Sequence, residues 1–246
     1  MSIVSFDIVV ARYNENLNWL DPIASHCIIY NKGDSLDPST AQKYKQVVAL
    51  PNVGREAHTF LTHLKLHAHN VPSHERHVTV FTQGCIQDHL SKSEHPQAET
   101  PHLYLLDLAK SAANNGMSLN AHKHNKGNMS AIPSFKMSSH FPHITDTGMT
   151  YDTWLEQNIQ KTIVGKTMRF PYGMKWYIAA VFAIRADVAQ RVPLSVFEHL
   201  IEQTSVSADP ESAYYMERTW FYMFNDVQMH AEMHAMEPIP RTHRPL

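Results

Sequence analysis

Cysteine is scarce in this chain of 246 residues, which contains only Cys27 and Cys85. Two cysteines cannot build a disulfide framework, so we expect a reducing compartment and an inert, buried thiol at each position. A long apolar run is also missing: the longest, residues 176–184, is far shorter than the roughly 20 residues of a membrane-spanning helix. The first apolar run, residues 8–11, has no basic leader of the secretory type. We therefore expect a cytoplasmic protein without a membrane span.

An excess of charge of one sign is equally absent. The 21 lysines and arginines and the 23 aspartates and glutamates give a formal net charge of −2, whereas nucleic-acid-binding domains usually carry a basic surface. We therefore expect no nucleic-acid partner. Apolar residues make up 43% of the chain and charged residues 18%, which is ordinary for a globular protein with a sizeable core.

Several motifs of well-known sites do not occur. Residues 164–167 (Val-Gly-Lys-Thr) resemble the end of a P-loop, but Gln160 stands where that motif needs its first glycine. Gly-x-Ser-x-Gly and Gly-x-Gly-x-x-Gly are both absent. Among the 18 histidines, His63 and His67 have i, i+4 spacing, yet no His-Glu-x-x-His motif or cysteine cluster accompanies them. We expect mostly surface histidines, and a histidine-rich metal-binding or interaction protein is the third alternative for the function.

Strand-like and helix-like segments alternate in the first part of the chain. Apolar runs predict strands at residues 7–12, 26–30, 46–50 and 78–82, and 3.6-residue periodicity predicts a helix over residues 55–69. This alternation favours an α/β fold with a mainly parallel central sheet and helices on both faces. Ligands of such sheets bind beyond the carboxyl ends of the strands.

The second half of the chain is less regular. Residues 116–148 are polar and predict a long loop, whereas the apolar run at residues 176–184 predicts a buried strand. Further helices are predicted at residues 101–114, 151–160, 186–191, 194–204 and 211–224. We expect a single domain over residues 1–236, followed by an extended or disordered proline-rich tail over residues 237–246.

Polar residues follow the first predicted strand directly. In Val-Val-Ala-Arg-Tyr-Asn-Glu (residues 9–15), Arg12 is a planar cation suited to phosphate and Asn14 can bind a base or ribose edge. A strand end closed by a turn is the structural alternative. Arg55 lies in Gly-Arg-Glu (residues 54–56) at a predicted helix start, where backbone amides favour an anion. There the alternative is that Glu56 stabilises the first turn of the helix and that Arg55 pairs with a carboxylate.

Two further pairs could carry chemistry. Asp88 and His89 follow the strand 78–82 and are the nearest approach to a metal-binding or acid–base pair at a strand end, with a capped loop as the alternative. Glu217 and Arg218 bring charge into an apolar helical segment. A partly buried Glu217 would have a raised pKa and would suit a general base. The alternative is a surface ion pair between Glu217 and Arg218.

These segments, in this order, resemble a domain family of unknown function that is grouped with GT-A glycosyltransferases. The resemblance covers roughly residues 7–225 and is most specific in the Gly-Arg-Glu block and in the Glu-Arg-x-Trp block. Its motifs are Val-Val-Ala-Arg-Tyr-Asn-Glu (9–15), Ile-Tyr-Asn-Lys-Gly (29–33), Pro-Asn-Val-Gly-Arg-Glu-Ala-His-Thr-Phe (51–60), Val-Phe-Thr-Gln-Gly (80–84) with Asp88-His89, Ala-Ala-Val-Phe-Ala-Ile-Arg (179–185) and Glu-Arg-Thr-Trp-Phe-Tyr-Met-Phe (217–224).

The resemblance implies a Rossmann-like GT-A fold and a glycosyltransferase. Such an enzyme moves a sugar from a nucleoside-diphosphate-sugar, most often a UDP-sugar, to a hydroxyl of a glycan or glycoprotein acceptor. The residues implied at the donor site are Ala11, Arg12, Tyr13, Asn14, Glu15, Tyr30, Lys32, Arg55, Gln83 and Gly84. Glu217 is the implied general base, with Asp88 in reserve.

The sequence departs from the superfamily at the strand end where many relatives carry Asp-x-Asp, a motif that binds Mg²⁺ or Mn²⁺. Here Gln83-Gly84-Cys85 contains no carboxylate. The ligands of Mn²⁺ or Mg²⁺ would then be Asp88 and His89, or else Arg55, Lys32 and helix dipoles would stabilise the leaving group without a metal. The missing motif favours the alternative function, a nucleotide-sugar-binding protein that has lost transfer.

Overall fold

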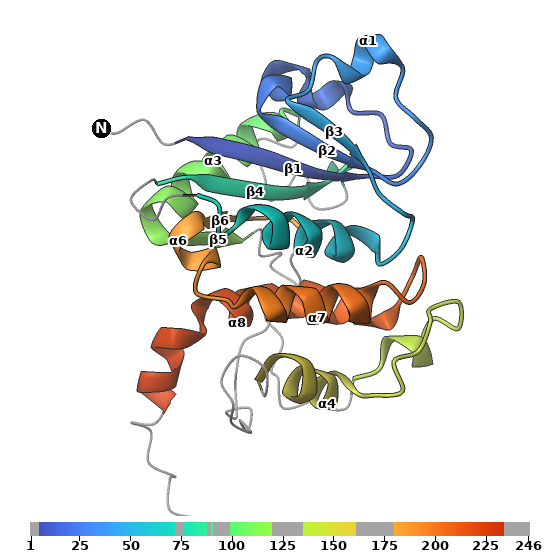
Figure 1. Ribbon diagram of the computed structural model, residues 1–246, viewed down its shortest axis with the longest axis vertical. Helices are drawn as coiled ribbons and strands as arrows, with labels where there is room; N and C mark the ends of the chain where they lie inside the picture. Colours follow the sequence, from blue (N-terminus) through green and yellow to red (C-terminus); the bar gives the residue numbers. More distant parts are fainter. Residues whose placement is uncertain are drawn as a thin grey trace, which may run out of the picture.

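The computed structural model describes residues 5–71, 76–87, 90, 99–119, 135–160 and 180–233. This part of the chain forms a six-stranded sheet of order β3-β2-β1-β4-β6-β5 (Figure 1). The strands are β1 (Phe6–Arg12), β2 (Cys27–Asn31), β3 (Gln46–Ala49), β4 (Val78–Gln83), β5 (Met117–Leu119) and β6 (Phe182–Arg185). β1 pairs in parallel with β2 and β4, and β2 with β3, whereas β6 is antiparallel to β4 and β5. The prediction of a mainly parallel α/β fold, compatible with a Rossmann-like arrangement, is confirmed.

Helices cover both faces of the sheet. On one face lies α2 (Arg55–His67), with α7 (Leu194–Thr204), α8 (Glu211–Met233) and α4 (Tyr151–Leu155) packed beyond it (Figure 1). The other face is covered by the 3₁₀ segment η1 (Asn18–His26) and by α3 (Pro101–Asn115). The short elements are α1 (Pro38–Ala41), η5 (Met137–Ser139), a π-helical turn over Glu156–Gln160 and α6 (Ala186–Ala189).

The middle residues of the central strand β1 are apolar because both of its faces are buried. Val9 packs into the core on the α2 face, while Ile8 and Val10 pack into the core under η1 and α3, and all three are fully buried. No helix in the described ranges has the length and apolar character needed to cross a bilayer.

Two predictions in the second half of the chain need correction. Met117–Leu119 form strand β5 inside the segment predicted as a long loop, because Met117 and Leu119 pair with β6 and add an edge to the sheet. Of the strand predicted over 176–184, residues 176–179 lie outside the described residues, 180–181 form a bend, and β6 extends from Phe182 to Arg185. The segment η1 was not predicted, although its buried Leu20, Ile23 and Ala24 have the i, i+3, i+4 spacing of a helical apolar face. Residues 237–246 lie outside the described residues.

Candidate functional site

The chain order reverses at the pairing of β1 with β4. From β1 the chain adds β2 and β3 on one side and then places β4 on the other. Such a switch point leaves a crevice beyond the carboxyl ends of the strands. The register brings these ends level, since Arg12 lies beside Asn31 and Ala11 beside Gln83. Two hollows open at this edge, one on each face of the sheet.

The first hollow, of about 420 Å³, lies on the α2 face. Its wall comes from the end of β1, from the first residues of α2, from the end of β4 and from the segment before α8. The side chains that give it charge are three cations (Arg12, Lys32 and Arg55) and three carboxylates (Glu15, Glu56 and Asp209). Of the predicted donor-site residues, Ala11, Tyr13 and Gln83 line it as well.

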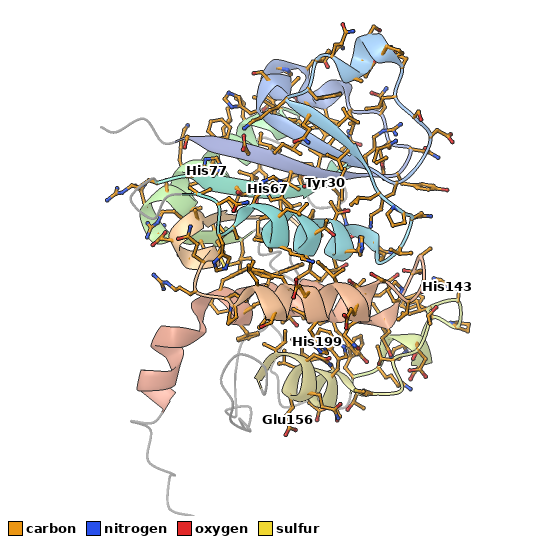
Figure 2. All side chains as sticks on the ribbon, in the orientation of Figure 1. Tyr30, His67, His77, His143, Glu156 and His199 are labelled. Atoms are coloured by element: carbon orange, nitrogen blue, oxygen red, sulfur yellow. The ribbon has the colours of Figure 1, made fainter. Side chains whose placement is uncertain are left out.

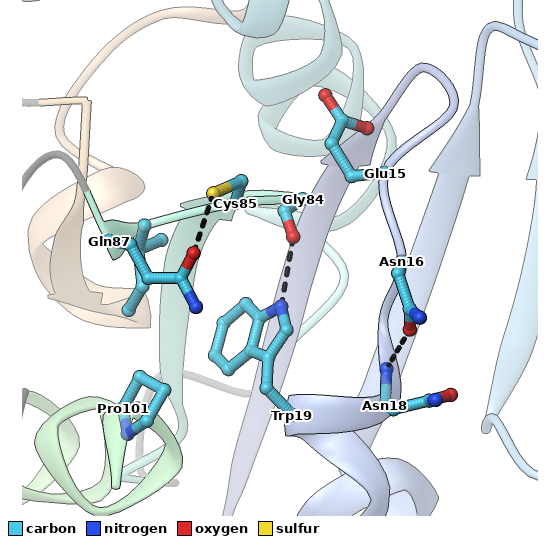
Figure 3. A pocket seen from close by; sticks show the side chains of 9 residues that line it. Glu15, Asn16, Asn18, Trp19, Gly84, Cys85, Gln87 and Pro101 are labelled. Carbon is cyan, nitrogen blue, oxygen red and sulfur yellow. Dashed lines mark hydrogen bonds between the residues drawn. The ribbon is translucent and has the colours of Figure 1, made fainter. Parts of the chain in front are cut away.

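The second hollow, of about 510 Å³, lies on the face covered by η1 and α3. Figure 3 shows its lining, with the indole ring of Trp19 between Gly84, Gln87 and Pro101. Glu15 and Cys85 line both hollows. The two hollows therefore adjoin across a ridge at the ends of β1 and β4.

Arg12 braces the strand ends. Its guanidinium donates to the carbonyl oxygens of Tyr13, Glu15 and Asp34 and to Asn31 Oδ1, which lies at 2.5 Å, and the residue is only 9% exposed. Those bonds hold the loops after β1 and β2 together at the rim of the hollow. Arg12 therefore serves the geometry of the site and is not a free cation for phosphate.

The loops after β1 and β2 touch closely at Gly33. A side-chain carbon added there would lie 1.9 Å from the Tyr13 carbonyl oxygen, so only glycine fits. Beside it, Asn14 Oδ1 accepts the backbone N–H of Asp34 at 2.8 Å. Asn14 thus supports the loop and does not line either hollow.

The start of α2 has an uncommon backbone. Gly54 is left-handed (φ +64°), and an added carbon there would lie 2.3 Å from the Thr204 carbonyl oxygen. Arg55 follows with φ +48°, the one left-handed non-glycine residue in the described chain. Two consecutive left-handed residues turn the chain sharply, and backbone strain of this kind is concentrated at functional sites.

The Arg55 side chain is held over the first hollow by residues of the α8 side. Its Nη1 donates to the Tyr214 hydroxyl at 2.9 Å and pairs with Asp209 Oδ1 at 3.2 Å. The guanidinium also stacks on the Tyr214 ring, 4.6 Å from its centroid. A third of the Arg55 side chain remains exposed.

Lys32 lies deeper in the first hollow. Its Nζ donates to the carbonyl oxygens of Val53 and Arg55, so two of its three N–H groups brace the turn before α2. Burial lowers the pKa of Lys32 to about 8, although the charge of Glu56 opposes this shift. Lys32 is therefore a cation whose charge is easily lost.

Buried polar atoms without a partner gather at this turn. In the described chain, five of the seven buried side-chain N and O atoms that have no hydrogen-bond partner are Arg55 Nε, Glu56 Oε1, His58 Nδ1, Thr59 Oγ1 and Ser207 Oγ. Buried polar groups in proteins are nearly always paired, so such a concentration indicates a site for a ligand or for proton sharing.

Glu56, which is buried, and Glu217, which is partly buried, form a pair of neighbouring carboxyl groups. Glu56 is 7% exposed and lines the first hollow, whereas Glu217 lies behind it on α8 and lines neither hollow. Burial raises the pKa of Glu217 to about 8, and the charge and hydrogen bond of Glu56 add to the rise against the opposing charges of Arg218 and Arg55. The raised pKa favours the protonated form of Glu217, which can donate to Glu56.

The raised pKa of Glu217 agrees with the prediction, and the alternative, an ion pair with Arg218 at the surface, does not fit the burial of Arg218. Arg218 is only 6% exposed, donates to the Tyr214 carbonyl oxygen at 2.7 Å and lies 4.9 Å above the Phe135 ring. Sequence reasoning assigned Glu56 only to helix stabilisation. The signal for its role was its place next to Arg55 at a strand–helix junction.

The ridge between the hollows is formed by Glu15 and Gly84. A carbon added to Gly84 would lie 2.7 Å from Glu15 Oε2, which accepts the Tyr13 N–H at 2.7 Å. On the other side, Trp19 Nε1 donates to the Gly84 carbonyl oxygen at 2.9 Å (Figure 3). Trp19 was missed from the sequence because it lies in the unpredicted segment η1.

Other predicted residues lie elsewhere. Tyr30 is 1% exposed in the core and its hydroxyl lies 3.1 Å from His63 Nδ1, away from both hollows. Asp88 and His89 lie outside the described residues. The prediction of two buried thiols is right for Cys27, where burial raises the pKa to about 12, and wrong for Cys85, which is exposed.

Three of the described histidines lie at the opposite, amino-terminal edge of the sheet. His63, His67 and His77 line a hollow of about 240 Å³ there, and Figure 2 shows His67 and His77 on that side of Tyr30. His63 is 4% exposed, which corrects the expectation of surface histidines for this residue. Within the described ranges, no three His, Cys, Asp or Glu residues are grouped so that they could hold a metal ion.

Fold and site together define an α/β protein with a polar crevice at the switch point of its sheet. The chain belongs to the family described as Protein of unknown function (DUF3431), whose model matches residues 8–236. The comparisons with curated proteins and with solved structures returned no match.

Proposed function

We propose that the protein is a glycosyltransferase of the GT-A type, which moves a sugar from a nucleoside-diphosphate-sugar to a hydroxyl of a glycan or glycoprotein. The main support is the first hollow, where Lys32 and Arg55 face the Glu56–Glu217 pair at the switch point. The strand order β3-β2-β1-β4-β6-β5 with an antiparallel β6 agrees with this proposal.

The diphosphate of the donor is placed against Lys32 and Arg55. One N–H of Lys32 remains for a ligand after its two bonds to Val53 and Arg55. The guanidinium of Arg55 is partly exposed, with its Nη1 paired to Asp209 and its buried Nε 3.7 Å from Glu56 Oε2. Both cations can therefore bind the phosphate oxygens and offset the charge that develops on the leaving group.

Glu56 is the proposed general base. It takes the proton of the acceptor hydroxyl, whose oxygen forms a bond to the anomeric carbon. The bond between that carbon and the phosphate oxygen breaks, and its electron pair leaves with the nucleoside diphosphate. Glu217 acts through Glu56. Because Glu217 keeps its proton, the negative charge of the pair stays on Glu56, the carboxylate that lines the hollow. This replaces the direct role predicted for Glu217.

Mn²⁺ or Mg²⁺ is part of the proposal only as a partner of the diphosphate. The strand end Gln83-Gly84-Cys85 supplies no carboxylate, and Glu15 is the nearest one on the ridge. The described residues do not form a ligand group for a metal, and Asp88 and His89 lie outside them. No step above depends on a metal.

Binding of a nucleotide sugar without transfer is the second candidate. It is favoured by the engagement of Arg12 with backbone carbonyl oxygens and by the pairing of Arg55 with Asp209. These contacts leave fewer free cations than a transferase usually directs at its leaving group.

The test is a thermal-shift screen of nucleoside diphosphates and nucleotide sugars, each with EDTA, Mg²⁺ or Mn²⁺. A ligand at about 100 times its Kd stabilises the folded state by about 2.7 kcal/mol and raises Tm. Absence of a shift with every nucleotide at millimolar concentration would reject the donor site. With a donor identified, Glu56→Gln should abolish both transfer and slow donor hydrolysis while donor binding persists, whereas a wild-type protein that binds but never hydrolyses the donor supports the second candidate.

A further inference from the structure

The second hollow differs in chemistry from the first. Among the described residues that line it, Glu15 at the ridge is the sole charged one, and the others are amides, apolar groups and one indole. Such a lining suits a flat, uncharged, hydrogen-bonding ligand, whereas the described cations that could bind a phosphate line the first hollow, across the ridge.

Trp19 presents a fixed ring to this hollow. Its Nε1–H bond to the Gly84 carbonyl oxygen holds the indole in place, and the residue is half-buried. Aromatic faces held in this way stack with heterocycles at small cost in conformational entropy. Figure 3 shows the Gln87 amide on the same side of the hollow as the ring. Gln87 Oε1 lies 3.6 Å from Cys85 Sγ, which leaves the exposed amide nitrogen to donate to a ligand.

The ridge residue Glu15 stands between this neutral hollow and the cationic one. Its Oε2 accepts the Tyr13 N–H, and a carboxylate has room for further donors. Carboxylates bind ribose hydroxyls in other nucleotide-binding sheets, although there the acidic residue follows a later strand than β1. Across the ridge the chain therefore offers an aromatic ring, a carboxylate and then two cations, in the order base, ribose, diphosphate.

We propose that the second hollow binds the nucleobase of the donor, stacked on Trp19 and read by Gln87, with the ribose hydroxyls at Glu15. This inference rests on the proposed function, because it assigns the two hollows to two parts of one ligand. A separate saccharide in the second hollow would use the indole and the amides, but it would leave the ordered sequence of ring, carboxylate and cations without a reason.

The experiment compares two probes on each variant by calorimetric titration: the nucleoside diphosphate that gives the largest thermal shift, and inorganic pyrophosphate. Trp19→Leu removes the ring, Trp19→Phe keeps a stacking face, and Gln87→Ala removes the exposed amide. Phe141→Leu is the matched control, since Phe141 is a 46% exposed aromatic residue that lines neither hollow.

Trp19→Leu should weaken the nucleoside diphosphate by about tenfold or more, as stacking energies of single bases require, and Trp19→Phe should restore most of the loss. Pyrophosphate affinity should stay within twofold in every variant. Glu15→Gln, which keeps an acceptor for the Tyr13 N–H, should reduce the preference for the ribonucleotide over its 2′-deoxy form, with Glu202→Gln as control.

Unchanged nucleoside diphosphate affinity in Trp19→Leu and Gln87→Ala would overturn the inference and leave the proposed function standing. The inference would also be overturned if the variants kept their nucleoside diphosphate affinity and lost only the transfer to the acceptor. That result would assign the second hollow to a saccharide. Failure of the wild-type protein to bind any nucleoside diphosphate would instead reject the proposed function. If Trp19→Leu loses affinity for pyrophosphate as well, the substitution has damaged the fold. The affinities of Gln87→Ala and Glu15→Gln for the nucleoside diphosphate then decide whether the inference holds.

Discussion

The pair of carboxyl groups at the first hollow, Glu56 and Glu217, predicts how the stability of the fold depends on pH. Burial, together with Glu56, raises the pKa of Glu217 from 4.5 to about 8. A group whose pKa is higher in the folded state stabilises the fold fully below its unfolded pKa, and this contribution disappears as pH rises through the folded pKa. Glu217→Gln carries a permanently neutral side chain of nearly the same shape, so it should lack that dependence.

The size of the expected change in the free energy of unfolding follows from the pKa shift of Glu217. Each pH unit between the experimental pH and the folded pKa corresponds to about 1.4 kcal/mol. Between pH 6.5 and pH 9 the wild-type protein should therefore lose about 2 kcal/mol relative to Glu217→Gln. Lys32, whose pKa is lowered to about 8 by burial, titrates in both proteins, so its contribution cancels in the comparison.

Urea denaturation at pH 6.5, 7.5, 8.5 and 9 measures this difference through the free energy of unfolding. Glu202→Gln, at an exposed glutamate of α7, controls for the change of a carboxyl to an amide and should run parallel to wild type. Parallel curves for wild type and Glu217→Gln would show that Glu217 is ionised at neutral pH and that the shared proton does not exist.

Three further substitutions test other contacts. Gly33→Ala should cost more than about 2 kcal/mol in urea denaturation, because its new methyl would lie 1.9 Å from the Tyr13 carbonyl oxygen; a smaller loss would show that the loops separate easily. Glu211→Ala should lower stability by about 3–5 kcal/mol, since a fully buried carboxylate that accepts bonds from Ser138 and from Thr147 would be lost; a change under 1 kcal/mol would contradict this structural role. Pyrophosphate affinity should fall about tenfold between pH 7 and pH 9 as Lys32 loses its proton, and Lys32→Met should remove that dependence in the same titration.

Much of the fold could be predicted from local sequence because the central strands have apolar side chains on both faces. The run at residues 7–12 has no polar alternation, and it lies between β2 and β4 as such a run requires. The helices whose apolar residues keep the 3.6 period, such as α2 and α7, also lie where predicted. β5 could not be predicted, since three residues acquire strand geometry only from the edge that β6 presents.

The candidate site was predictable in position but less so in the role of each side chain. Strand ends mark the crevice, because parallel strands and their register bring those ends to one edge. Which cation remains free depends on nearby carbonyl oxygens, and these come from loops distant in the sequence. Arg12 is engaged by the carbonyl oxygen of Asp34, whereas Arg55 keeps an exposed face, and no local pattern distinguishes the two.

The backbone turn at the start of α2 explains why Glu56 lines the first hollow and Glu217 does not. A glutamate in the first turn of a helix usually favours the helix dipole and faces water. At α2 the left-handed pair Gly54–Arg55 turns the chain so that this turn packs against the residues before α8. Glu56 is thereby buried against Glu217 and still lines the hollow. The left-handed turn thus places a carboxylate where two cations converge. Gly54→Ala would add a carbon 2.3 Å from the Thr204 carbonyl oxygen and should displace this turn, so the pH dependence of stability that Glu217 contributes should become smaller in urea denaturation.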